Sequence, residues 1–227
     1  MREKIGLEFW EYMSEDELFN IVNNYPTFYI KDDTTLSDIE NLNEGNYIIN
    51  KFPSINLLKQ FPKFMNNCGE IMILMINDKL VMNISKNEYS YYAGELIPIL
   101  KKGDSILLNV HSHPIEDVKI NVGVPSMNDL KNGNSFNKLV YIIHDKGVLE
   151  YDISSINHID KEIIDISFWK YICSNPEYKK MNIYDQENLY CDYIGLKRRQ
   201  LTFEEFYSIY NRIKEEKFIH TSEIRKI

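Results

Sequence analysis

Short apolar runs separated by turn residues occupy the middle of the chain. Residues 70–76 are almost all apolar, which predicts a buried strand, and residues 80–84 follow across a short polar turn as its hairpin partner. The apolar runs at 105–111, 139–143 and 148–153 predict three further strands, the last two joined by a glycine-containing turn. The pattern therefore predicts a sheet built largely from the centre of the chain.

Helical spacing of apolar residues lies on both sides of these runs and between them. Helices are predicted over residues 14–24, 55–66, 89–101, 159–172 and 203–215, and from residue 126 onward. Ser54 is the expected N-cap of the second helix, and Pro62 is expected to shorten or kink it. Thr202, followed by two acidic residues, is an N-terminal signature for the helix at 203–215.

The distribution of these elements divides the chain into three parts. Residues 1–53 form an N-terminal extension, in which 27–31 and 47–49 are predicted to be short strands. Residues 54–153 form an α/β core, and residues 154–227 form a helical C-terminal extension. The predicted fold class is α/β (α+β), with a mixed sheet flanked by helices.

The charge of the chain narrows the partners it is expected to bind. The formal net charge is −8, which disfavours general binding to nucleic acid because phosphate backbones are repelled. The densest basic run, Lys197-Arg198-Arg199, is most simply interpreted as the solvated face of a helix. We therefore expect no nucleic-acid partner.

Cysteine use and hydropathy indicate a soluble protein of a reducing compartment. The three cysteines are odd in number and include no CxxC pair, so a disulfide framework or a cysteine zinc site is not expected. The N-terminus interrupts its apolar residues with charges and does not resemble a signal peptide. The longest apolar run, 71–76, is too short to span a bilayer. The expected location is the cytoplasm, with no membrane contact.

Two histidines provide the first candidate for chemistry. His111 and His113 lie two residues apart at the end of a predicted strand, so their side chains point to the same face and can share one metal ion. A pair with this spacing is weak evidence on its own, because surface histidine pairs with no ligand role also have it. His144 lacks ligand-like spacing, and a structural or surface role is expected for it.

A carboxylate could complete a site with these histidines. Ser126 and Asp129 have the spacing of a helix capping box, which is the simplest explanation for them. Asp129 in the first turn of that helix could also project toward the histidines as a third ligand. A site with three protein ligands and one open position is typical of catalytic zinc.

Hydrolysis by a zinc-bound water also needs a proton acceptor that is not a ligand. Glu70 is the best candidate, because it stands at the start of an apolar strand where a charge is otherwise hard to explain. The alternative is that Glu70 simply lies at the solvent end of its strand. Glu95 and Glu116 are weaker candidates for the same role.

The order and spacing of these residues resemble the JAMM (MPN+/JAB) family of zinc metalloproteases. The family motif is a glutamate on an early strand, then HxHP, then P-S-x-x-D-L at the start of a helix. Here it corresponds to Glu70, to His111-Ser112-His113-Pro114 and to Pro125-Ser126-Met127-Asn128-Asp129-Leu130. The likeness covers residues 54–153, under half of the chain. It implies an MPN/JAB-like mixed sheet with a core similar to that of cytidine deaminases.

The resemblance also implies a role for each matching residue. His111, His113 and Asp129 match the Zn²⁺ ligands, and Glu70 matches the general base. Ser126 matches the serine that hydrogen-bonds the tetrahedral oxyanion. The loop at 114–125 is longer than is usual for the family and contains Asp117, an alternative third ligand.

Members with this full set are isopeptidases or peptidases, many of which act on ubiquitin-like conjugates. The expected partner is therefore a protein or peptide, bound in extended form by strand addition at a sheet edge near the metal. Two other functions remain open. One is a non-catalytic MPN-type scaffold, and the other is a metal-dependent nuclease or phosphoesterase using the same ligands. The sequence does not predict the oligomeric state.

Overall fold

The fold was obtained as a computed structural model. It describes residues 24–67, 69–76, 79–86, 106–113, 139–152, 155, 176–181, 185, 189, 191–193 and 195–224. The helices predicted over 14–24, 89–101 and 159–172 and from residue 126 lie wholly or almost wholly outside these ranges. Of the helices in the described ranges, none is both long enough and apolar enough to cross a bilayer.

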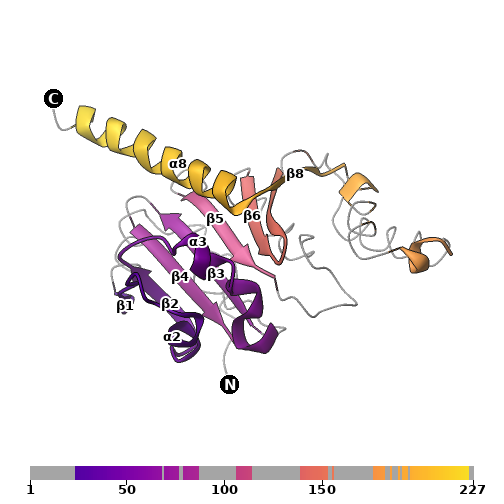
Figure 1. Ribbon diagram of the computed structural model, residues 1–227. Coiled ribbons are helices and arrows are strands. Elements are labelled where there is room, and N and C mark those ends of the chain that lie inside the picture. The colour runs from indigo at the N-terminus through magenta and orange to yellow at the C-terminus, as the bar shows by residue number, and fades with distance from the viewer. Residues whose placement is uncertain are drawn as a thin grey trace, which may run out of the picture.

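An eight-stranded mixed sheet forms the centre of the fold (Figure 1). Its strands in chain order are β1 (Thr27–Phe28), β2 (Gly45–Ile49), β3 (Glu70–Ile76), β4 (Lys79–Ser85), β5 (Ile106–Ser112), β6 (Leu139–His144), β7 (Gly147–Asp152) and β8 (Lys197–Leu201). Their spatial order is β1-β2-β4-β3-β5-β6-β7-β8. The β1–β2 and β5–β6 pairs are parallel, and the other pairs are antiparallel. The predicted fold class, a mixed α/β fold built on a mixed sheet, is thus confirmed.

Few helices accompany the sheet in the described residues. They are α2 (Leu36–Glu40), α3 (Ile55–Leu58), the 3₁₀ helices η2 (Phe61–Asn67) and η5 (Tyr178–Lys180), and α8 (Phe203–Ile224). Helix α8 contacts β5, β7, β8 and α3, and η2 contacts β3 and β6. The sheet draws strands from all three segments into which the sequence pattern divides the chain.

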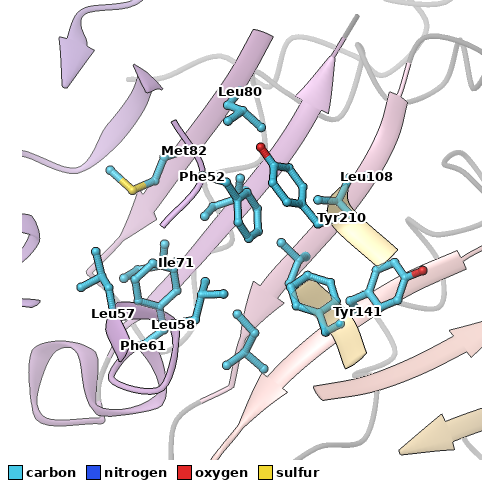
Figure 2. Packing of buried hydrophobic residues seen from close by; sticks show 14 of the residues in the cluster. Phe52, Leu57, Leu58, Phe61, Ile71, Leu80, Met82, Leu108, Tyr141 and Tyr210 are labelled. Atoms are coloured by element: carbon cyan, nitrogen blue, oxygen red, sulfur yellow. The ribbon is translucent and has the colours of Figure 1, made fainter. Parts of the chain in front are cut away.

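The face of the sheet beneath α3, η2 and α8 carries the main apolar core (Figure 2). Alternate residues of β3 and β5, such as Ile71 and Leu108, pack there against α3 and α8 side chains. Phe52, in the connection between β2 and α3, stacks on Tyr210 of α8 with ring centroids 4.2 Å apart. Burial raises the pKa of Tyr210 to about 12. Aromatic packing therefore fixes α8 against the sheet.

The helix predicted over 55–66 is divided in two. Ser54 caps α3 as expected, because its hydroxyl accepts a hydrogen bond from the Leu57 amide at 3.3 Å. The α-helix ends at Leu58, and the chain continues as the 3₁₀ helix η2. Pro62 accounts for the change, since it has no N–H to donate and disfavours α geometry at the residue before it.

The interpretation of Lys197-Arg198-Arg199 as a helix face is wrong, because these residues belong to the edge strand β8. Arg199 lies directly opposite Glu150 of β7, and their side chains form an ion pair at 3.0 Å. Arg198 pairs with Asp192 at 3.0 Å. Pairing with β7 overrides the weak strand propensity of a charged run, and charges suit an edge strand because they oppose aggregation.

Gly147 starts β7 and lies close to Gln200 and Leu201 of β8. Its φ of +150° is rarely adopted by residues with a side chain. An added Cβ would clash with the carbonyl oxygen of Leu201 and lie 2.8 Å from Gln200 Nε2. Gly147→Ala is therefore expected to lower the free energy of unfolding by at least about 2 kcal/mol, measured by urea denaturation.

Gly45 offers a matched control for this substitution. Its φ is +142°, yet among the described residues no atom beyond Gly45 and its two chain neighbours lies within 4 Å of an added Cβ. Gly45→Ala should therefore suffer only the backbone strain and lose less stability than Gly147→Ala. Equal losses in the two variants would contradict the steric explanation.

Candidate active site

The face of the sheet opposite the apolar core carries several buried polar side chains. Residues paired across neighbouring strands share a face, so Met72 of β3 lies on the same side as Asn83 of β4 and His111 of β5. Asn109 and His113 share this face with His111, because side chains alternate along a strand. All three are buried, at 4%, 5% and 1% exposure for Asn109, His113 and His111.

Four residues form a line across the ends of four adjacent strands, which we call the polar row: Ser85, Glu70, His113 and His144. Ser85 and Glu70 are paired directly. Continuing the β3–β5 register from Met72 and His111 by two residues places Glu70 opposite His113. Continuing the β5–β6 register by one residue from Ser112 and Ile143 places His144 beside His113. The His113 amide donates a hydrogen bond to the Ile143 carbonyl at 3.0 Å. The row therefore lies along one rim of the sheet.

The two predicted ligands meet within the site. The Nε2 atoms of His111 and His113 are 3.1 Å apart, and their ring centroids are 5.0 Å apart. Two nitrogens at about 2.0–2.1 Å from a tetrahedral zinc ion would be about 3.3 Å from each other. The two imidazoles thus present Nε2 atoms at a separation that fits a shared metal ion.

Ser112, between the histidines, points to the opposite face and is fully buried. Its hydroxyl accepts a hydrogen bond from the Ile71 amide at 3.0 Å. This bond joins the start of β3 to the end of β5 beyond the last paired residues of the two strands, Met72 and His111. Ser112 therefore holds the strand end that carries half-buried Glu70 in register with His113.

His144 is buried at 4% exposure, and hydrogen bonds account for both ring nitrogens. Nε2 lies 3.1 Å from Gln200 Oε1, and Nδ1 accepts a hydrogen bond from the Lys146 amide at 3.3 Å. Burial lowers the pKa of His144, which favours the neutral ring. These contacts give it the structural role expected from the sequence, linking the β6–β7 turn to β8. Its place in the polar row was not predicted.

Asn109 and Asn83 also belong to the polar face and were not predicted from the sequence. Asn83 Nδ2 donates a hydrogen bond to Asn46 Oδ1 at 2.7 Å. Apolar and polar residues alternate over residues 108–111, and this alternation was the sequence signal for Asn109. Asn83 has no comparable local signal, because its place on the face depends on the β3–β4 register.

The remaining predicted site residues cannot be placed. Asp129 and Ser126 lie outside the described residues, as do the alternatives Glu95, Glu116 and Asp117. Within the described ranges, no group of three His, Cys, Asp or Glu side chains could hold a metal ion. The described part of the site therefore contributes two candidate nitrogen ligands and a neighbouring carboxylate, and all three metal ligands remain predictions.

The expected docking of a peptide at a sheet edge near the metal is not supported by the strand order. Among the described strands, β5 lies inside the sheet between β3 and β6, and the edges are β1 and β8. Two strands separate β5 from β8, and three separate it from β1. A substrate would instead reach His113 at the rim formed by the strand ends.

Comparison of the chain with models of protein families, with curated proteins and with solved structures finds no match.

Proposed function

We propose that this protein is a zinc-dependent peptidase or isopeptidase with an MPN/JAB-like core. The observation that carries the proposal is the pair of buried imidazoles, with His111 and His113 Nε2 atoms 3.1 Å apart. The register that places Glu70 beside His113 supports it further. Two converging nitrogens with a carboxylate on the adjacent strand are among the parts that a single-metal hydrolase requires.

Each residue then has a defined task. His111 and His113 would hold the ion from β5, with Asp129 as the proposed third ligand. Zinc held there would supply Lewis acidity and make water a stronger acid. Glu70 accepts a proton from the attacking water and returns it to the departing amine. Ser126 donates a hydrogen bond to the oxyanion.

The proposed substrate is a protein or peptide with an accessible amide bond, such as the flexible tail of a ubiquitin-like protein. The net charge of −8 disfavours phosphate-rich substrates. The polar row lies at the rim of the sheet, so an extended segment would cross the strand ends rather than pair with an edge. The bond to be cleaved would lie over His113 and Glu70.

Metal content provides the direct test. The purified chain is expected to bind one zinc ion, and His113→Ala is expected to bind none under the same conditions, because one nitrogen ligand is lost. His144→Gln serves as the matched control, since that imidazole lies in the same row with both nitrogens hydrogen-bonded within the protein. Zinc would be measured by elemental analysis, with folding monitored by circular dichroism.

Activity assays then separate the competing functions. Cleavage of peptide or isopeptide substrates that stops on chelation and returns with zinc supports the proposal. Zinc binding without any hydrolysis, unaffected by Glu70→Gln, would indicate a scaffold. Metal-dependent cleavage of DNA or a phosphoester would indicate the nuclease or phosphoesterase. A wild-type chain that binds no zinc would rule out the proposed function.

A further inference from the structure

Asn109 is a buried amide in apolar surroundings. It is 4% exposed, it is paired with Leu74 of β3, and the β5–β6 register places Val140 on its other side. Leu74 and Val140 are 0% and 2% exposed. No described residue donates a hydrogen bond to its Oδ1 atom. A buried acceptor without a donor costs about 1–3 kcal/mol, so its presence here requires an explanation.

The nearest polar position on the same face is the candidate metal ligand. Asn109 and His111 are two residues apart on β5, so their side chains project side by side. His111 turns its Nε2 atom toward Nε2 of His113. A ligating nitrogen must be unprotonated, so the ring proton of a metal-bound His111 would sit on Nδ1. That N–H is buried with the ring and needs an acceptor.

We infer that Asn109 is a positioning residue for the metal site, whose Oδ1 accepts a hydrogen bond from Nδ1–H of His111 when zinc is bound. This inference rests on the proposed zinc site. The bond holds His111 in the tautomer that presents Nε2 to the ion and restrains rotation of the ring. Acceptors of this kind behind ligating histidines typically change metal affinity 10- to 100-fold when removed. Asn109 therefore stabilises the zinc-bound protein and destabilises the metal-free protein.

The test compares metal affinity with the stability of the metal-free chain. Asn109→Leu removes the acceptor and keeps the branched shape of the side chain. It is expected to weaken Zn²⁺ binding about 10- to 100-fold, measured by competition with a chromogenic chelator. The metal-free variant should be at least as stable as the metal-free wild type, because a buried polar group with no partner is replaced by an apolar one. Asn109→Asp retains an acceptor and should restore binding to within a few-fold of wild type.

Asn83→Leu is the matched control, because it is a buried asparagine of the same face with a hydrogen-bonded partner. It strands the Asn46 Oδ1 acceptor and should lower stability without changing Zn²⁺ affinity. If Asn109→Leu bound Zn²⁺ with wild-type affinity, this inference would be overturned, but the proposed zinc site would still stand. Loss of binding in both Asn109→Leu and Asn109→Asp would also overturn it, since the effect would then be general disruption. A wild-type chain without Zn²⁺ binding would overturn the proposed function and the inference together.

Discussion

Glu70→Gln is expected to lower the rate of amide hydrolysis by about 100- to 10,000-fold while zinc remains bound. Glutamine keeps the size and polarity of the side chain but cannot accept the proton from the attacking water. The β3–β5 register and the hydrogen bond from the Ile71 amide to Ser112 Oγ place Glu70 beside His113, so the lost carboxylate lies next to the proposed metal ligands. Rates would be measured on fluorogenic peptide and isopeptide substrates, with zinc content determined on the same samples.

A carboxylate elsewhere in the sheet gives the control for this prediction. Glu150 of β7 pairs with Arg199 and lies opposite Tyr141, a residue of the apolar face, so it is turned away from the polar row. Glu150→Gln should leave the rate unchanged. Hydrolysis by Glu70→Gln at the wild-type rate would exclude Glu70 as the base. Zinc loss from Glu70→Gln would show that the carboxylate is a ligand instead.

Phe206→Ala is expected to lower the free energy of unfolding by about 3–5 kcal/mol. Phe206 is 0% exposed, and its ring lies 5.1 Å from Tyr141 of β6 and 6.1 Å from Phe52, measured between centroids. Truncation removes the aromatic group that joins α8 to the sheet and leaves a cavity between them. Urea denaturation monitored by circular dichroism measures the loss.

Ser208 provides the comparison within the same helix. It is exposed two residues after Phe206, and its hydroxyl bonds to the Glu204 carbonyl on the helix surface. Ser208→Ala should change stability by no more than about 0.5 kcal/mol. A small loss in Phe206→Ala would mean that α8 contributes little to the core, contrary to the packing seen beneath it.

Local pattern predicted the central strands well. The predicted strand at 70–76 has the same bounds as β3, and those at 80–84, 105–111, 139–143 and 148–153 differ from β4 to β7 by at most one residue at each end. Apolar runs between turn residues specify such strands because each can be buried in only one way. The helix at 203–215 was also predicted, although α8 extends to Ile224.

Elements with weak or conflicting local signals were not predicted. Helix α2 lies in a polar stretch and was not predicted, although Thr35 and Asp38 form a capping box at its start. Strand β8 has no strand-like alternation and exists because β7 offers it a pairing edge. Such a strand is decided by its neighbour and not by its own residues.

The sequence by itself determined that His111 and His113 share a face, because two-residue spacing on a strand has that consequence in any fold. It also determined that the chain could form a mixed sheet with an apolar interior. Tertiary structure alone decided that Glu70 lies opposite His113, that Asn109 is buried between Leu74 and Val140, and that β5 lies inside the sheet. The physical reason is that residues far apart in sequence become neighbours through strand register, which long-range pairing and packing set together.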